Sequence, residues 1–408
     1  MNKILHFNQN LRSKDPKSVY YLLTFMSDFA IGLIFSTYVL FLKNRGLDLF
    51  QVSLVNFAFM ISTFLFEIPT GAFADFFGRR KSILISSLFI SVSLLVYYFS
   101  KNLTGFIIAE ITVALATTFA SGSLDAWVVD RMSEKGFTGK YDFVFSQGNI
   151  ASRLAVLIAG LMGGYLGSVN LALPFLVGSI ISLLGFVIGL FLIEENFVRP
   201  KKLNFKLISA RISGIARESI DYGLRHKIIF WLLLSSFLMM AAYMPLNMFW
   251  QPRFNQLAGN QIWILGWVWA GFSLMMMLGS YVLQKIKTKN LFLPFLISIF
   301  FLSIPILLIS KLAIFLPVFI GFMVHEVGRG MQVPLHKAYI NRFIPAEKRA
   351  TILSFDSAIE KLGGAVGLLI LGYIGKNYSI NFAWLISGIL LLLLVFTYRK
   401  ATLGQTNS

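Results

Sequence analysis

The feature that most constrains this chain is a series of apolar runs that recur from one end of the sequence to the other. A run of about 20 apolar residues can cross the hydrocarbon core of a bilayer as one α-helix. Because lipid offers no partners to backbone polar groups, such runs are expected to be helical. We predict twelve spans, near residues 19–42, 51–70, 82–100, 103–129, 143–166, 171–194, 228–250, 261–283, 291–309, 312–335, 350–374 and 380–398. The expected fold class is an all-α integral membrane protein.

Composition agrees with this fold class and excludes several others. Of the 408 residues, 57% are hydrophobic and 13% are charged, whereas soluble domains carry about 25% charged residues. Cysteine is absent, which excludes disulfides and thiolate metal sites, and the four histidines lack metal-ligand spacing. No nucleotide-binding P-loop pattern occurs in the sequence. We therefore expect no enzymatic activity, no cofactor and no bound metal.

The basic charge of the chain indicates its orientation. The net charge is +18, and most of the 36 Lys and Arg residues fall in the N-terminal segment, in alternate inter-span segments and after the last span. The positive-inside rule predicts that these segments are cytoplasmic, with an even number of spans and both termini inside. We expect a monomeric, multi-pass protein of a bacterial plasma (inner) membrane, with no nucleic-acid partner.

The longest polar interval, residues 195–227, divides the chain into two sets of six spans. The expected domains are an N-terminal bundle over residues 1–194 and a C-terminal bundle over residues 228–408. Apolar residues within the interval follow a helical stripe, which favours an amphipathic helix on the inner leaflet. A solvated linker is the alternative interpretation.

The two halves also match each other at one constant offset. The aligned pairs are Gly71 with Gly279, Arg153 with Lys361, and Gly164-Tyr165-Leu166-Gly167 with Gly372-Tyr373-Ile374-Gly375. Glycines and intramembrane cations are rare enough to make this match informative. Six-helix bundles in parallel repeat are an architecture of secondary transporters.

A charged cluster interrupts the apolar sequence between the second and third spans. Its members are Gly71, Asp75, Gly78, Arg79 and Arg80. Gly71 permits close helix packing and Gly78 permits a tight turn. Asp75 can accept hydrogen bonds at a helix N-terminus, and the arginines can pair with a carboxylate or a lipid phosphate.

The pattern Gly-x-x-x-Asp-x-x-Gly-Arg-Arg resembles the signature of the major facilitator superfamily at this same loop. The resemblance implies twelve spans and a transporter that alternates between inward-open and outward-open states. It also implies that Asp75 lies against the start of the eleventh span, near Ala350-Thr351, and that Asp130 engages Arg79 or Arg80. These contacts would form a latch on the cytoplasmic side. The alternative is a charged turn that only fixes topology.

Charged groups inside the spans are the candidates for the proton and substrate cavity. Each costs about 2.5–3.5 kcal/mol at a helix centre and needs a partner, a water-filled cavity or a role. The candidates are Asp28, Glu110, Asp125, Arg153, Glu326, Arg329 and Lys361. In the family that the signature resembles, spans one, four, seven and ten line the cavity, which favours Asp28, Glu110 and Asp125.

Spacing along the helices predicts several pairs among these groups. On one continuous helix, Glu110 and Asp125 would lie about 60° apart in azimuth. Glu326 and Arg329 have i,i+3 ion-pair spacing. Arg153 is expected to pair with Asp125, and Lys361 with Asp356 or Glu360. The alternative for each group is a structural ion pair that never takes up a proton.

The function expected from these residues is proton-coupled efflux of small amphipathic or cationic compounds. The sequence differs in two places from the pattern of the drug–proton antiporters within this family. These differences weaken any direct assignment of the antiporter mechanism to this chain. Glu110 occupies the place of an arginine, and the Ala159–Gly164 segment lacks a proline. The alternatives are a proton-coupled importer of a small anionic metabolite, with Arg153, Arg329 and Lys361 as binding cations, and a membrane sensor that does not transport.

Overall fold

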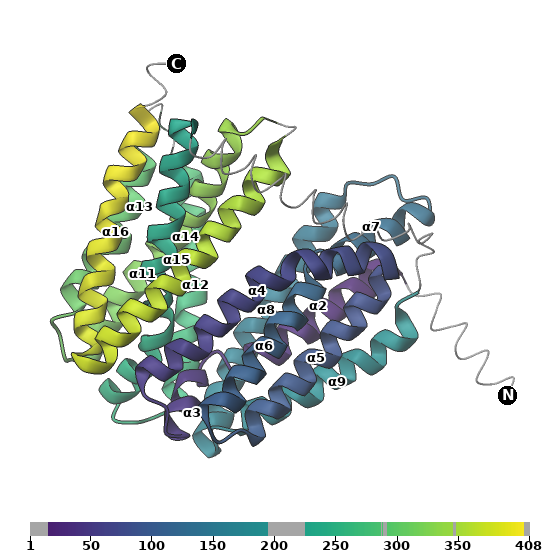
Figure 1. The fold of residues 1–408 in the computed structure, drawn as a ribbon, viewed down its shortest axis with the longest axis horizontal. Coiled ribbons are helices and arrows are strands. Elements are labelled where there is room, and N and C mark those ends of the chain that lie inside the picture. Colours follow the sequence, from purple (N-terminus) through teal and green to yellow (C-terminus); the bar gives the residue numbers. More distant parts are fainter. Residues whose placement is uncertain (1–14, 195–224, 287, 289–291, 346–347, 404–408) are drawn as a thin grey trace, which may run out of the picture. The chain divides into compact units, whose positions relative to one another are not determined.

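The structure is a computed structural model that describes residues 15–194, 225–286, 288, 292–345 and 348–403. All regular secondary structure in these residues is helical (Figure 1). In the first half the helices are α2 (Pro16–Gly32), α3 (Tyr38–Asn44), α4 (Leu49–Phe77), α5 (Arg79–Phe99), α6 (Leu103–Ala120), α7 (Ser123–Glu134), α8 (Tyr141–Val169) and α9 (Leu173–Leu192). In the second half they are α11 (Lys227–Leu257), α12 (Trp263–Lys285), α13 (Phe292–Ile309), α14 (Phe315–Phe343), α15 (Arg349–Asn377) and α16 (Ile380–Leu403).

Within the part of the chain that the structure describes, ten helical segments are long and apolar enough to cross a membrane. The two remaining predicted spans correspond to α2 with α3 and to α14. The 17-residue α2 ends at Gly32, and a turn separates it from α3. The middle of α14 carries His325, Glu326 and Arg329, which lower its hydropathy. The all-α membrane fold class is confirmed.

The described chain forms two compact units. Unit 1 comprises the described residues of Met1–Gly46, Ser62–Leu203 and Ile262–Trp269, and unit 2 those of Leu47–Ile61, Asn204–Gln261 and Ala270–Ser408. The start of α4 thus groups with unit 2, and the start of α12 with unit 1. The predicted linker lies almost wholly outside the described residues, so the domain boundaries of the sequence analysis stay a prediction.

Unit 1 is organised around α2 and α5. Helix α2 packs on α8 and α9, and α5 packs on α6 and α9 (Figure 1). An aromatic cluster of Phe41, Tyr97, Phe106 and Phe175 forms part of the core, with ring centroids 4.3–5.9 Å apart. All four side chains are buried.

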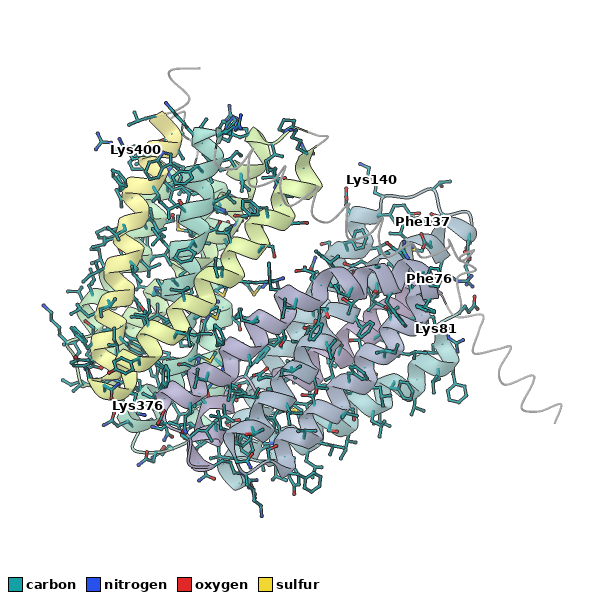
Figure 2. All side chains as sticks on the ribbon, in the orientation of Figure 1. Phe76, Lys81, Phe137, Lys140, Lys376 and Lys400 are labelled. Atoms are coloured by element: carbon teal, nitrogen blue, oxygen red, sulfur yellow. The ribbon has the colours of Figure 1, made fainter. Side chains whose placement is uncertain are left out.

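Unit 2 is organised around α11, which packs on α15 and α16, while α13 packs on α14 and α16 (Figure 1). Phe254, Phe272, Phe322 and Trp384 form its aromatic core. Figure 2 shows Lys376 and Lys400 at opposite ends of this unit. Lys376 follows the predicted span 350–374, and Lys400 follows the predicted span 380–398. The segments after these two spans therefore lie at opposite ends of unit 2, as two successive spans require.

Glycines make some of the closest helix contacts in both units. A Cβ atom on Gly163 would strike the carbonyl oxygen of Leu33, where α2 has just ended. In unit 2, a Cβ atom on Gly367 would strike the carbonyl oxygen of Ala241 in α11. These glycines allow backbone-to-backbone contact, which drives helix association in lipid.

The repeated Gly-Tyr motif has an equivalent packing role in each unit. In unit 1, a Cβ atom on Gly164 would lie 2.8 Å from the backbone nitrogen of Gly266 in α12. In unit 2, the aligned Gly372 packs against Ser53 at the start of α4. The tyrosines that follow face aromatic partners, since Tyr165 stacks on Trp263 and Tyr373 contacts Phe50. The two halves therefore repeat each other in these packing contacts as well as in sequence.

Candidate functional site

A polar pocket of about 470 Å³ lies within unit 1. It is built by α2, α7 and α8, and its lining residues are Tyr20, Thr24, Asp28, Asp125, Phe145, Gly148, Asn149 and Ser152. Two of the predicted cavity acids, Asp28 and Asp125, thus lie in one pocket. Of the described residues that line it, none is basic.

Asp125 reaches this pocket because the predicted fourth span is not one helix. The chain breaks after Ala120, and Gly122 adopts a left-handed conformation with φ of 67° before α7 begins. Asp125 then lies in the first turn of α7, where the helix dipole favours a negative charge. Tyr20 of α2 donates a hydrogen bond of 2.8 Å to Asp125 Oδ1.

Gly148 makes the contact between Tyr20 and Asp125 sterically feasible. A Cβ atom at this position of α8 would collide with the Tyr20 ring, whose hydroxyl also lies within 2.8 Å of it. Phe145, one turn earlier, meets the same ring edge-on at 6.3 Å. The aromatic side chain is thereby held between α7 and α8.

Asp28 lies on the same side of α2 as Tyr20 and Thr24. Its carboxylate accepts a hydrogen bond from Ser152 of α8. Because Asp28 is only half-buried, it is open to the pocket rather than enclosed in the helix packing. Asp28 therefore faces a pocket in this unit, whereas its place in a central cavity lined by both halves stays a prediction.

The predicted alignment of Glu110 with Asp125 on one helix face is wrong. The break at Ser121 and Gly122 changes the direction of the chain, so the azimuth of a continuous helix does not apply. Glu110 is instead buried among α3, α5 and α6, where Tyr38 donates a hydrogen bond to it at 2.5 Å. Tyr97 lies 3.2 Å from the Tyr38 hydroxyl. Glu110 does not line the pocket described above.

The expected ion pair of Arg153 with Asp125 is also wrong. Arg153 is exposed on α8, and the hydrogen bond to Asp125 comes from Tyr20. Its repeat counterpart Lys361 is half-buried on α15 and interacts electrostatically with the neighbouring Glu360. The two aligned cations therefore have different surroundings.

The predicted pair in α14 is confirmed. Arg329 Nη1 lies 3.5 Å from Glu326 Oε1, and it also donates a 2.9 Å hydrogen bond to Asn247. The guanidinium lies 5.2 Å from the centroid of the Tyr243 ring. Glu326 is 2% exposed, so this acid depends on Arg329 as its counter-ion.

The charged cluster between α4 and α5 is arranged around Gly78, whose φ of 97° confirms the predicted tight turn. Arg79 Nε lies 3.3 Å from Asp130 of α7, and Arg80 donates a 2.9 Å hydrogen bond to the Leu190 carbonyl near the end of α9. The ion pair that the resemblance implies is thus present, whereas its action as a latch stays a prediction. Figure 2 shows Lys81 and Lys140 at this same end of unit 1.

One member of the cluster behaves differently from expectation, and the prediction for Asp75 stays a prediction. Asp75 is exposed and forms no hydrogen bond or ion pair with a described residue of unit 1. Its expected neighbours Ala350 and Thr351 belong to unit 2. The predicted close approach at Gly71 is absent in unit 1, because a Cβ atom there would meet nothing within 4 Å. Its counterpart Gly279 does pack tightly, against the Val327 carbonyl of α14.

Tyr20, Asn149 and Ser152 line the pocket but were not predicted from the sequence. A tyrosine, an asparagine and a serine in apolar spans carry no charge, so no insertion cost singles them out. The one available signal was Gly148, which directly precedes Asn149. A glycine in a membrane helix indicates that a side chain of another helix packs closely there, and in the structure that side chain is Tyr20.

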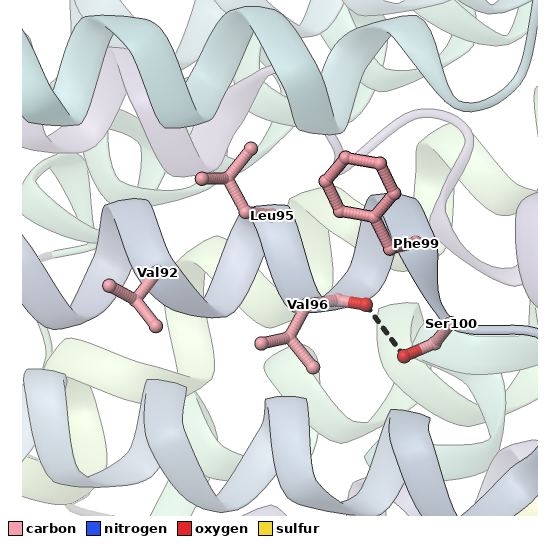
Figure 3. A pocket seen from close by; sticks show the side chains of 5 residues that line it. All are labelled: Val92, Leu95, Val96, Phe99 and Ser100. Carbon is pink, nitrogen blue, oxygen red and sulfur yellow. Dashed lines mark hydrogen bonds between the residues drawn. The ribbon is translucent and has the colours of Figure 1, made fainter.

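A second hollow of about 360 Å³ lies on the surface of α5. Figure 3 shows its lining by Val92, Leu95, Val96 and Phe99, with Ser100 donating a 2.6 Å hydrogen bond to the Val96 carbonyl. Val92 and Phe99 are exposed. An apolar hollow on a membrane-spanning helix suits acyl chains of lipid and offers no polar group for orienting a substrate.

The sequence model of the Major Facilitator Superfamily matches residues 20–325 and 312–406. The chain belongs to this family. Members of the major facilitator superfamily are transporters rather than enzymes, so this chain is a secondary transporter that works by alternating access and carries a small-molecule substrate.

Similar proteins agree with this family membership. The chain is 25% identical over 385 residues to the uncharacterized MFS-type transporter YxaM of Bacillus subtilis, a match that covers 93% of this chain and 94% of YxaM. It is 25% identical over 172 residues to Multidrug resistance protein 2 of the same organism, 42% of each chain. The crystal structure of the nucleoside transporter NupG superposes with a TM-score of 0.79 at 13% identity, covering 95% of this chain and 99% of NupG. At that identity the NupG likeness shows the fold alone.

Proposed function

We propose that this transporter exports small amphipathic cations from the cell in exchange for protons. The observation that carries the proposal is the unit 1 pocket, in which Asp28 and Asp125 supply two carboxylates and no described lining residue supplies a positive charge. Two carboxylates at one site attract cations and repel anions. The cargo is therefore expected to be positively charged.

The rest of the lining suits an amphipathic cargo. A volume of about 470 Å³ falls within the range of sites for drug-sized molecules. Phe145 and Tyr20 offer aromatic faces for cation–π contact, and Asn149 and Ser152 offer hydrogen bonds. Among the described residues the anion-import alternative has no comparable site, because Arg329 is paired with Glu326, Arg153 is absent from the pocket lining and Lys361 interacts with Glu360.

The direction of transport and the coupling ion rest on separate arguments. Export is proposed because one relative is named Multidrug resistance protein 2. Protons are proposed because carboxyl and imidazole groups buried in a span are the usual elements of proton relays. We place the protein in the plasma membrane with both termini cytoplasmic, on the distribution of basic residues alone.

A transport assay with the purified protein reconstituted in the membrane of proteoliposomes tests the proposal. The probes are tetraphenylphosphonium, a lipophilic cation, and tetraphenylborate, its anionic analogue, each under an imposed pH gradient. We expect gradient-driven movement of the cation but not of the anion. Asp28→Asn and Asp125→Asn should each lower the cation rate at least tenfold. Asp142→Asn, which removes an exposed carboxylate from the first turn of α8, is the matched control and should retain the rate.

Two results would contradict the proposal. Equal transport of both probes, or full activity of the Asp28 and Asp125 variants, would show that these carboxylates do not select the cargo. Failure of a broad panel of compounds to move in either direction would instead favour the sensor alternative.

A further inference from the structure

A second buried polar cluster lies wholly within unit 2. It joins four helices through Ser236 of α11, His336 of α14, Asp356 of α15 and Tyr398 of α16. The exposed fractions of these residues are 0%, 1%, 7% and 0%. The Phe295 ring stacks on Tyr398 at a centroid distance of 4.0 Å, which closes the cluster on one side.

The hydrogen bonds fix which nitrogen of His336 carries a proton. Ser236 Oγ donates to Asp356 Oδ1 at 2.6 Å. A hydroxyl has only one proton to donate, so Ser236 Oγ must act as the acceptor toward His336 Nε2, which lies 2.9 Å away. Nε2 therefore carries a hydrogen, and in the neutral ring Nδ1 does not.

The opposite nitrogen, Nδ1, lies 2.7 Å from the Tyr398 hydroxyl. When the imidazole is neutral, the phenol donates to Nδ1. When the ring is protonated, Nδ1–H donates to the phenol oxygen, and the phenol proton turns away from the ring. The cluster thus accepts one additional proton through the rotation of a single hydroxyl group.

A counter-charge for the protonated ring is already in place. Asp356 Oδ2 lies 3.8 Å from His336 Nε2. Glu360, one turn further along α15, interacts electrostatically with His336 and Asp356, and also with Lys337 and Lys361. From α11, Tyr243 is the titratable side chain that interacts with Tyr398. The nearest charge to the ring is therefore the carboxylate of Asp356.

The dimensions of the cluster restrict what it can bind. Its hydrogen bonds of 2.6–2.9 Å leave no room for another heavy atom between the partners. Within the described residues, no group of three or more metal-ligating side chains occurs. The ligand that fits is a single proton. Glu360 is only half-buried and gives the cluster a carboxyl group closer to water.

We propose that His336, Asp356, Ser236 and Tyr398 form the site that binds the coupling proton. This inference rests on the proposed proton-coupled function and adds to it a location in unit 2, separate from the cation pocket in unit 1. His336 holds the proton, Asp356 compensates its charge, and Ser236 and Tyr398 position the ring. A merely structural cluster would need only one of the two protonation states.

The site can be tested without any transport measurement. The chain contains four histidines, so ¹⁵N-histidine labelling gives few signals, and single His→Gln variants assign them. Long-range ¹H–¹⁵N spectra of the purified protein should show neutral His336 as the Nε2–H tautomer and its conversion to the doubly protonated ring on acidification. Asp356→Asn should lower the proton affinity of His336 at least tenfold, while Asp142→Asn leaves it unchanged. Tyr398→Phe is a second variant, in which a changed Nδ1 chemical shift would report the lost hydrogen bond.

Three spectroscopic results would overturn the inference. They are an Nδ1–H tautomer for His336, a protonation state that stays constant between pH 5 and 9, and an unchanged proton affinity in Asp356→Asn. Size-exclusion profiles and histidine spectra of each variant establish that the variant is folded before its titration is interpreted.

Transport by the same variants separates this inference from the proposed function. His336→Gln and Asp356→Asn should still exchange tetraphenylphosphonium across the membrane without a gradient, but they should lose the acceleration by a pH gradient. If both variants keep the acceleration, the proton site is wrong and the cation pocket stands. If the wild type moves no cation, the proposed function fails and the coupling role fails with it, even where the titration shows proton binding.

Discussion

The Tyr20 hydroxyl donates a 2.8 Å hydrogen bond to Asp125 and thereby joins α2 to α7 across one wall of the unit 1 pocket. Tyr20 is 5% exposed, so its hydroxyl has little access to water if the carboxylate is removed. The bond is part-buried because Asp125 is exposed to the pocket, and a hydrogen bond to a charged group contributes about 1.5–3 kcal/mol. This bond therefore holds the carboxylate in place and links the pocket to the stability of the unit.

The first prediction concerns this bond. Tyr20→Phe and Asp125→Ala should each lower the unfolding temperature in detergent, and the double variant should be more stable than the sum of the single effects implies. We expect a coupling free energy of about 1 kcal/mol or more from the double-mutant cycle. Tyr141→Phe, which removes an exposed hydroxyl bonded to Ser133, is the control and should stay within about 0.5 kcal/mol. Additive single effects would show that the bond does not form.

The position of Tyr20 and Asp125 also shows what could be predicted from sequence. The two-bundle membrane fold followed from apolar runs and basic loops, because bilayer thickness and loop charge act on single segments of the chain. The pocket did not follow, because the break at Gly122 rotates Asp125 away from the azimuth of α6. A single glycine in an apolar run does not reveal that its φ will be positive.

The second prediction concerns glycine packing. Gly163→Ala should destabilise the protein by about 1–3 kcal/mol, because its Cβ atom would overlap the Leu33 carbonyl and neither backbone can move freely. Gly71→Ala is the matched control in the same unit, since a Cβ atom there meets nothing within 4 Å. Thermal unfolding in one detergent compares the two. An equal loss of stability in both variants would contradict the close contact at Gly163.

The third prediction concerns Asp48, which lies before the first residue of α4. Asp48 Oδ1 accepts from Gln51 N–H at 2.9 Å, Gln51 Oε1 accepts from Asp48 N–H at 3.0 Å, and Lys376 lies 2.9 Å from Asp48 Oδ2. Burial alone would raise the pKa of Asp48, but the Gln51 backbone hydrogen bond and Lys376 together lower it below its ordinary value of 3.8. A lowered folded-state pKa means that the ionised group stabilises the fold above pH 3.8 and that this contribution is lost as the pH falls through the folded-state pKa.

Asp48→Asn should therefore be less stable than the wild type at pH 7, and the difference should shrink below pH 3.8. Because Asp48 and Lys376 are 35% and 43% exposed, solvent screens their attraction and we expect a difference of at most about 1 kcal/mol. Unfolding temperatures measured from pH 3 to 8 provide the test. A difference that grows on acidification would have the wrong sign for this account.

The fourth prediction separates a latch from a turn that only fixes topology. Arg79 and Asp130 are 27% and 42% exposed, so their ion pair should contribute no more than about 1 kcal/mol to stability. If it is a latch, Arg79→Asp should slow transport severalfold, and the double variant Arg79→Asp/Asp130→Arg should recover it. Arg80→Ala should mainly destabilise the end of α9, through the Leu190 carbonyl. Transport that is unaffected by Arg79→Asp would favour the topological interpretation.

Sequence patterns located charged groups well but assigned their partners poorly. Glu326 and Arg329 pair as predicted because both belong to one helix, where spacing decides the contact. Asp125, Glu110 and Asp356 instead meet hydroxyl groups on other helices, from Tyr20, Tyr38 and Ser236. Contacts between helices depend on rotation and packing, which the sequence of one helix does not specify.

Direct binding of a cation to the purified protein tests the central claim, that Asp28 and Asp125 form the cargo site. Isothermal titration of tetraphenylphosphonium into wild type, Asp28→Asn, Asp125→Asn and the control Asp142→Asn gives the four dissociation constants at one pH and salt concentration. The account predicts that each pocket variant binds at least tenfold more weakly than the wild type and that the control binds equally well. Dissociation constants within twofold of one another for all four proteins would contradict it.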